Sequence, residues 1–247
     1  ILVPAGHAGA NKELLHNLEL PYQAVTSTDL YLTHYLNDSA NDPVMNRIRA
    51  QKLRNSEEDK VKIFFVPSYL NGDDGVFNMP YYDLLVGMDL TAFPSYYEPW
   101  GYTPLESLAF KVPTITTTLA GFGLWVKEHY NMDHPGIEVI HREDGDASNV
   151  ATAIAEWVKH YPQVEETDLQ KDRDNAKDVS RIALWDNLIN YYKQAYTIAL
   201  NQVSVRLKDL PANMNESVSY IEKQLTVNNP SWVSVMIHRS IPEKLIA

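Results

Sequence analysis

Residues 90–123 constrain the fold more than any other part of this 247-residue sequence. The stretch opens with an apolar run at residues 90–93, which predicts a buried strand. Pro94 then ends the pairing of that strand, because proline has no backbone N–H to donate to a neighbour. The chain must therefore leave the strand through a loop at its carboxyl end, where ligands bind in open α/β sheets.

A helix start is expected directly after the loop. Thr103 is a good N-cap residue, the proline after it fits the first helical position, and Glu106 can complete a capping box. The first N–H groups of a helix attract anions, and Gly101 would let a phosphate approach the backbone. We therefore predict a diphosphate site at this helix start. Glu98 and Glu106 would face one ligand, one carboxylate on its ribose hydroxyls and the other on its sugar.

These residues resemble the glycogen synthases of the animal and fungal type, glycosyltransferase family 3. The marker of that family is a glutamate, seven further residues and a second glutamate, which is the spacing of Glu98 and Glu106. Other strings are also close to the family's own, namely YYEPWGYTP, VPTITT and GFG around the loop, and NDPVMNRIR and VKIFFVPSYLN upstream. The resemblance covers residues 1–200.

The resemblance implies a role for each matching residue. As catalytic residues, Glu98 would orient the transferred glucose and stabilise oxocarbenium charge, while Glu106 would hold the ribose. The residues that would bind the donor are Tyr81, on which uracil would stack, and Trp100, Gly101, Tyr102 and Thr103 around the sugar and the diphosphate. Taken singly, Tyr81 and Trp100 also fit ordinary packing, Thr103 fits a helix cap and Glu106 fits a capping-box partner.

The implied reaction is transfer of glucose from UDP-glucose to the 4-hydroxyl end of an α-1,4-glucan, with the anomeric configuration retained. ADP-glucose stays open as the donor. Paired carboxylates in hydrolases attack the sugar or activate water. A transferase gains more from positioning the sugar and excluding water, so we assign Glu98 to orientation rather than to attack.

Apolar and helical segments alternate along the chain, which is typical of a parallel sheet covered by helices. Strands are expected over residues 1–4, 61–66, 90–93, 113–117 and 137–140, and helices over residues 28–37, 42–54, 104–111, 147–160 and 182–200. The resemblance implies a Rossmann-like α/β domain over residues 1–200, the C-terminal half of a GT-B glycosyltransferase. Residues 201–247 are expected to form a tail or linker with a small additional unit.

The resemblance also implies that a complete enzyme needs more than this chain. In the family, an N-terminal GT-B half and the Arg and Lys that neutralise the diphosphate would precede residue 1. We therefore expect the isolated fragment to bind UDP weakly and to transfer no glucose. An alternative interpretation is a non-catalytic nucleotide-sugar-binding or glucan-binding module of a larger chain. The ending IPEKLIA resembles the approach to an α-glucan phosphorylase region, so that larger chain could be a fusion.

Charge and composition argue against several partners. A net charge of −11 disfavours binding to nucleic acid, which needs clustered Lys and Arg, and to an anionic membrane surface. The sequence has no Cys, no run of 18 apolar residues and no basic leader with an apolar signal core, so the cytoplasm is the expected location. The expected partners are the nucleotide-sugar donor, the glucan acceptor and the N-terminal GT-B half. Homo-oligomerisation of the full-length enzyme is left open.

Residues 165–181 are strongly charged, and three of their cations, Arg173, Lys177 and Arg181, share one helical stripe. Eukaryotic family members carry a denser arginine cluster here that binds glucose 6-phosphate. In this chain six acids oppose four bases. Acids precede bases by three positions, as is typical of a solvated helix, in Asp168/Lys171, Asp174/Lys177 and Asp178/Arg181. We therefore expect no activation by glucose 6-phosphate.

No metal or other cofactor is expected. Asp144 and Asp146 match the Asp-x-Asp metal signature of the other glycosyltransferase fold, but they lie between a predicted strand and helix, where acids serve as turn and cap residues. The eight His residues include no pair at zinc-ligand spacing with a supporting Cys or Glu.

Overall fold

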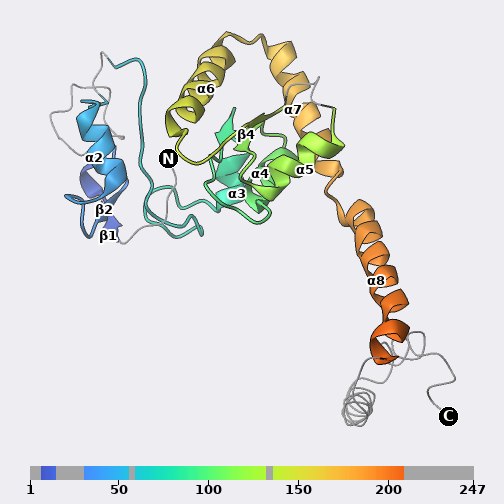
Figure 1. Ribbon diagram of the computed structural model, residues 1–247. Helices are drawn as coiled ribbons and strands as arrows, with labels where there is room; N and C mark the ends of the chain where they lie inside the picture. Colours follow the sequence, from blue (N-terminus) through green and yellow to red (C-terminus); the bar gives the residue numbers. More distant parts are fainter. Residues whose placement is uncertain (1–6, 15–30, 56–58, 132–135, 209–247) are drawn as a thin grey trace. The chain divides into compact units, whose positions relative to one another are not determined.

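The computed structural model describes residues 7–14, 31–55, 59–131 and 136–208 (Figure 1). The chain forms two compact units. The first comprises Ile1–Lys127 and Asn131–Lys177, and the second comprises Glu128–Tyr130 and Asp178–Ala247. The strand expected at residues 1–4 and most of the additional unit expected at residues 201–247 lie outside the described residues.

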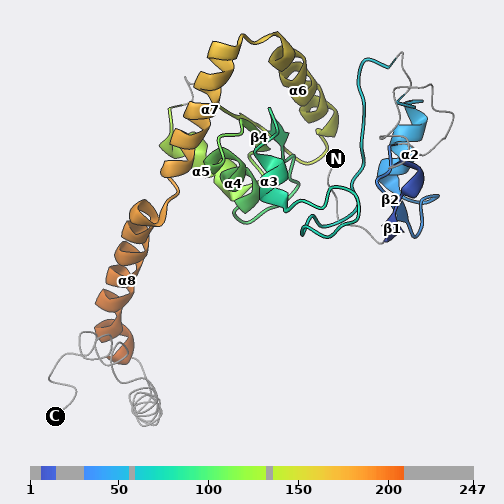
Figure 2. The same cartoon turned by 180° about the vertical axis from the view of Figure 1, so that it is seen from behind.

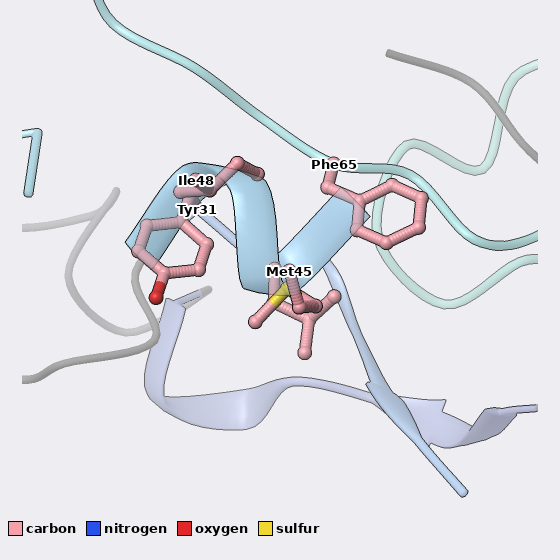
Figure 3. Close-up of a cluster of buried hydrophobic side chains, with 5 residues drawn as sticks. Tyr31, Met45, Ile48 and Phe65 are labelled. Carbon is pink, nitrogen blue, oxygen red and sulfur yellow. The ribbon is translucent and has the colours of Figure 1, made fainter. Parts of the chain in front are cut away.

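In the N-terminal part of the first unit, a small cluster of buried side chains packs on helix α2 (Pro43–Ala50). Asp42 caps this helix by accepting a 2.8 Å hydrogen bond from the N–H of Met45, as the sequence predicts. The members of the cluster are Tyr31, Leu32, Met45, Ile48 and Phe65. Figure 3 shows Tyr31 and Phe65 beside the helix, from which Met45 and Ile48 project. The helix expected over residues 42–54 is therefore confirmed, but it ends four residues early.

The helix expected over residues 28–37 is wrong in its described part. Residues 34–36 form strand β2 (His34–Leu36), which pairs antiparallel with β1 (His7–Ala10). Leu32 forms a parallel bridge with Phe65. Residues 31–34 are all buried, and the segment bonds to other backbone on both sides, which an extended chain can do and a half-exposed helix cannot.

The strand expected over residues 61–66 is reduced to the bridge at Phe65. At Ile63, two residues before Phe65, the side chain of Asn55 forms the backbone hydrogen bonds that a neighbouring strand would otherwise form. Its amide donates to the carbonyl oxygen of Ile63 at 2.7 Å and its Oδ1 accepts from the N–H of Ile63 at 2.8 Å. Side-chain bonds of this kind compete with a regular ladder.

The centre of the first unit is a parallel sheet in the order β3-β4-β5. Its strands are β3 (Thr91–Ala92), β4 (Thr114–Thr117) and β5 (Ile137–Ile140). All four residues of β4 are buried, as expected for a strand covered on both faces. The predicted parallel α/β sheet is confirmed. Strand β3 is shorter than the predicted strand at residues 90–93. The N–H of Phe93 still donates to the carbonyl oxygen of Ile115 at 2.8 Å.

Helices alternate with these strands. Around the sheet they are α3 (Tyr81–Leu85), α4 (Tyr102–Ala109), α5 (Gly121–His129), α6 (Ala147–His160), the 3-10 helix η1 (Tyr161–Gln163) and α7 (Glu166–Arg181). Helix α6 has the predicted bounds and covers Ile115 and Ile140 through Val150. Both views show α4 and α5 beside the sheet, so the loop between β3 and α4 lies at one edge of a rigid core (Figure 1, Figure 2).

Helix α7 carries the charge pairs expected of a solvated helix. Lys171 bonds to Asp168 at 2.7 Å, and Arg181 bonds to Asp178 at 3.0 Å. The third acid, Asp174, instead forms a 2.7 Å ion pair with Lys111, which follows α4. Because Lys111 lies far away in sequence, the local pattern could not reveal this pair.

The second unit contains α8 (Trp185–Lys208). The helix expected at residues 182–200 is confirmed. It continues past residue 200, the predicted border between the domain and the tail. None of the helices in the described ranges is long and apolar enough to cross a membrane.

Candidate functional site

The loop of residues 93–101 between β3 and α4 is called the motif loop below. The helix after it starts two residues earlier than predicted. Helix α4 begins at Tyr102, and its N-cap is Gly101, which has the left-handed angles φ 104° and ψ 75°. Thr103 therefore lies inside the first turn, and Glu106 is the fifth helical residue. The predicted cap at Thr103 and its capping box with Glu106 are wrong. The reason is that a glycine adopts the left-handed conformation easily, so the chain can turn into the helix before it reaches Thr103.

Gly101 also lets three groups approach one another closely. A Cβ atom at this position would lie 3.3 Å from Cγ of Pro104, 3.5 Å from Cγ of Glu98 and 3.6 Å from Cβ of Ala120. The side chain of Glu98 therefore lies next to the start of α4, while the residue itself is exposed. A larger residue at position 101 would be strained by the positive φ and would crowd Pro104, whereas its contact with Glu98 would be an ordinary one.

The backbone of Glu98 is paired with the segment that leads into α5. Its N–H donates to the carbonyl oxygen of Leu119 at 3.1 Å, and its own carbonyl oxygen accepts from the N–H of Gly121 at 3.0 Å. The N–H of Phe122 donates to the carbonyl oxygen of Trp100 at 2.6 Å. These bonds fix the loop on both sides of Glu98.

The two glycines at the start of α5 make this pairing sterically allowed. A Cβ atom at Gly121 would collide with the carbonyl oxygen of Pro99, and one at Gly123 would collide with the carbonyl oxygen of Thr117. The sequence predicts that these glycines lead into a helix, and α5 confirms it. The structure shows that they allow α5 to approach both the motif loop and the end of β4.

Glu106 lies beside two tyrosines of α3. The hydroxyl of Tyr82 donates a hydrogen bond to the Glu106 carboxylate, and this bond raises the pKa of Tyr82. Burial raises the pKa of Tyr81, with smaller contributions from Glu106 and Tyr82. Tyr82 also stacks on Phe110, with ring centroids 5.1 Å apart. The structure thus brings Tyr81 and Glu106 into one neighbourhood, as the sequence-based assignment requires.

The other three donor-site candidates have different surroundings. Trp100 is half-buried against α5, with its ring 5.8 Å from that of Phe122 and 6.0 Å from that of Trp125. Tyr102 is 68% exposed, and Thr103 is exposed beside it in the first turn of α4. Trp100 therefore takes part in packing, whereas Tyr102 and Thr103 are accessible to a ligand.

Sequence reasoning missed two residues of this region. Tyr82 contacts Glu106, and the aromatic pair at residues 81–82 was the only local signal for it. Arg142 follows β5 and is only 5% exposed, and its Nη1 donates to the carbonyl oxygens of Pro94 at 2.8 Å and Ser95 at 3.2 Å. An arginine is rarely this buried unless it is paired; here Nη1 is bonded, whereas Nε has no hydrogen-bond partner among the described residues.

The Asp-x-Asp segment has a structural role in the described residues. Oδ2 of Asp146 accepts from the N–H of Glu143 at 3.1 Å and closes the turn before α6. The residue itself occupies the N-cap position of that helix, although its side chain makes no cap bond. Within the ranges that the structure describes, no group of three or more His, Cys, Asp or Glu side chains could hold a metal ion.

The chain is similar to known glycogen synthases. A family model described as glycogen synthase matches residues 18–241. Glycogen (starch) synthase isoform 1 of Saccharomyces cerevisiae is 31% identical over 174 residues, which cover 69% of this chain and 25% of the relative. Glycogen (starch) synthase of Caenorhabditis elegans is 31% identical over 194 residues, which cover 78% of this chain and 28% of the relative. The liver glycogen (starch) synthase of Mus musculus is 30% identical over 171 residues, which cover 69% of this chain and 24% of the relative.

The chain spans about a quarter of the length of the curated relatives that it matches. The family model extends past residue 200, where the resemblance found in the sequence ended. Because the model matches most of the chain, and the loop between β3 and α4 has the geometry described above, the chain belongs to the glycogen synthase family.

Proposed function

We propose that this chain is the donor-binding half of a retaining glucosyltransferase, which transfers glucose from UDP-glucose to the 4-hydroxyl end of an α-1,4-glucan. The observation that carries the proposal is the position of Glu98, whose backbone is paired with residues 119–121 and whose Cγ lies next to Gly101 at the start of α4. The site thus places a carboxylate beside a helix N-terminus. Family membership supports the substrate class.

The start of α4 is suited to a diphosphate. Because the N-cap is a glycine, no cap side chain competes with a ligand for the first N–H groups of the helix. These groups and the positive end of the helix dipole stabilise negative charge on the leaving diphosphate. In this proposal Gly101 and the exposed residues Tyr102 and Thr103 line the diphosphate.

The remaining roles follow from the neighbours of each side chain. Glu98 orients the glucose and stabilises positive charge at the reacting carbon, with Trp100 beside the same sugar. Glu106 accepts hydrogen bonds from the ribose hydroxyls, and Tyr81 stacks on uracil. The proximity of Tyr81 and Glu106 supports the last two roles, because a nucleoside presents its base and its ribose side by side.

Several wider features belong to the same proposal. We propose that residues 1–200 form the donor-binding domain, that residues 201–247 form a tail with a small unit, and that an N-terminal GT-B half completes the enzyme. The reaction needs no metal or other cofactor. The enzyme works in the cytoplasm, and homo-oligomerisation of the full-length protein is left open.

The test is a comparison of binding and turnover in the full-length protein. Calorimetric titration with UDP-glucose and with ADP-glucose gives the donor preference, and incorporation of labelled glucose into glycogen gives the transfer rate. We expect tighter binding of UDP-glucose and measurable transfer. Glu106→Gln is expected to weaken UDP binding, whereas Glu156→Gln, an exposed residue of α6, is the matched control. Binding without transfer would favour the non-catalytic module, and absence of nucleotide-sugar binding would contradict the glucosyltransferase.

A further inference from the structure

Arg142 joins the end of β5 to the motif loop by its side chain. Its Nη1 donates to the carbonyl oxygens of Pro94 at 2.8 Å and Ser95 at 3.2 Å, and its Cζ lies 3.6 Å from the centre of the Tyr96 ring. The hydroxyl of Thr117 also donates to the carbonyl oxygen of Ser95, at 3.0 Å. Three consecutive residues before Tyr97 and Glu98 are thus held by one guanidinium.

The backbone of Arg142 holds the segment that pairs with Glu98. Its N–H donates to Oγ1 of Thr118 at 2.9 Å, and its carbonyl oxygen accepts from the same hydroxyl at 3.3 Å. Leu119, the next residue, accepts from the N–H of Glu98 at 3.1 Å. Residue 142 therefore contacts both backbone segments that flank Glu98, residues 94–96 through its guanidinium and Thr118 through its backbone.

Apolar packing alone leaves the loop poorly supported on this side. An open hollow of about 210 Å³ separates the loop from α6, and it is lined by Pro94, Tyr96, Arg142, Ala147, Val150, Ala151 and Ile154. Atoms that line this open hollow face solvent and have no protein packing partner on that side. The charge-assisted bonds of Arg142, which are stronger than neutral ones, replace such packing.

We propose that Arg142 is a positioning residue, which sets the place of Glu98 for glucosyl transfer by clamping residues 94–96 and residue 118. The inference rests on the proposed function for its effect on turnover, but the clamp itself can be tested without turnover. In this inference Arg142 acts through the loop and contacts neither the donor nor the reacting atoms. Its loss should therefore lower kcat and leave the KM for UDP-glucose nearly unchanged, because Tyr81 and Glu106 keep their places on α3 and α4.

The first test compares Arg142→Gln with Arg173→Gln in the full-length protein. Arg173 is a matched control, since its guanidinium also bonds a carbonyl oxygen and a carboxylate, those of Met88 and Asp89, but on the segment before β3. We expect Arg142→Gln to lower kcat about 100-fold, the cost of misplacing a reacting group by about 1 Å. KM should change less than about threefold, and Arg173→Gln should leave both values near wild type.

Arg142→Lys and Tyr96→Leu keep the inference testable if Arg142→Gln does not fold. Lysine retains a cation that can donate to a carbonyl oxygen but cannot stack as a planar group, so kcat should recover in part. Tyr96→Leu removes the ring under the guanidinium and should lower kcat less than the loss of Arg142 does. A kcat within threefold of wild type for Arg142→Gln, or an equal loss for Arg173→Gln, would overturn the inference.

Hydrogen exchange separates this inference from the proposed function. In Arg142→Gln the amides of Glu98 and Gly121 should exchange about tenfold faster or more, because local opening of the loop becomes easier, while the amides of α6 stay protected. If the wild-type protein transfers no glucose, the proposed function fails and exchange still decides the clamp. Unchanged exchange at Glu98, or faster exchange throughout the protein, would overturn the clamp.

Discussion

The N–H of Gly121 donates to the carbonyl oxygen of Glu98 at 3.0 Å, so the first residue of α5 holds the backbone of the proposed catalytic carboxylate. The bond exists only because Gly121 lacks a side chain, since a Cβ atom there would collide with the carbonyl oxygen of Pro99. The glycine is therefore as much a part of the site as the glutamate.

Gly121→Ala should disable the enzyme through this contact. The added methyl group forces the loop away from α5, at a cost of about 1–3 kcal/mol in the free energy of unfolding, as for other overpacked sites. We expect the rate of glucose transfer to fall about 100-fold, because Glu98 moves with the loop. Thermal unfolding and transfer assays check both effects. Gly87→Ala is the control, since its Cβ would lie 3.4 Å from the nearest atom. Wild-type transfer by Gly121→Ala would show that the contact between α5 and the loop does not position Glu98.

Glu98→Gln should separate binding from transfer. The substitution keeps the shape of the side chain and removes its charge, so stabilisation of positive charge at the sugar is lost. A single electrostatic group of this kind is worth about 10²–10³ in kcat. UDP lacks the glucose that Glu98 is proposed to orient, so the Kd for UDP should change less than about twofold. Calorimetry with UDP and transfer assays supply the two values, with Glu166→Gln on α7 as an exposed control. Unchanged transfer would remove Glu98 from the mechanism.

Tyr82→Phe tests the contact that sequence reasoning missed. The hydroxyl of Tyr82 donates to the Glu106 carboxylate, and its removal leaves that carboxylate less well held for the ribose. Because a less well-held carboxylate binds the ribose more weakly, the Kd for UDP should rise about two- to tenfold. Tyr69→Phe is the control, because Tyr69 is 76% exposed. Equal affinities for the two variants would show that Tyr82 does not support Glu106.

The features that sequence predicted well are those set by local pattern. The strand at residues 137–140 and the helix at residues 147–160 have the predicted bounds, because apolar alternation and helical periodicity are local signals. The start of α4 itself was placed too late, since the left-handed angle of Gly101 overrode the capping preference of Thr103.

Features that depend on distant residues could not be predicted. Arg142 bonds to Pro94 and Ser95 across more than forty positions, and no local pattern links them. The extended segment at residues 31–34 depends likewise on Phe65, which overrides the helix preference of the sequence around it. Tertiary contacts of this kind decide between two local structures that the sequence permits.

The pH dependence of stability should reveal the carboxyl of Glu138 in β5. Burial raises its pKa above the ordinary value of 4.5, although Lys127 and a hydrogen bond from Trp157 oppose the shift. The folded state then binds the proton more tightly than the unfolded state, so this group favours folding below pH 4.5. That contribution is lost as the pH rises through the folded-state pKa.

Glu138→Gln removes this dependence. The variant should have a higher Tm than wild type at pH 7, because it no longer holds a partly buried charge, and a similar Tm below pH 4.5. Scanning calorimetry at both values gives the comparison. Glu156→Gln serves as an exposed control on α6. A Tm for Glu138→Gln that is lower than wild type at neutral pH would mean that Lys127 and Trp157 outweigh burial.

Helix α7 should not respond to glucose 6-phosphate. A phosphate needs several cations that can turn toward it together. Here Arg173 bonds to Asp89 at 2.9 Å, Arg181 bonds to Asp178 at 3.0 Å and Lys171 bonds to Asp168 at 2.7 Å, so an acid accompanies each of these cations. We expect the transfer rate of the full-length protein to change less than about twofold with glucose 6-phosphate at any UDP-glucose concentration. A several-fold activation that Arg173→Gln abolishes would show that these ion pairs open for the phosphate.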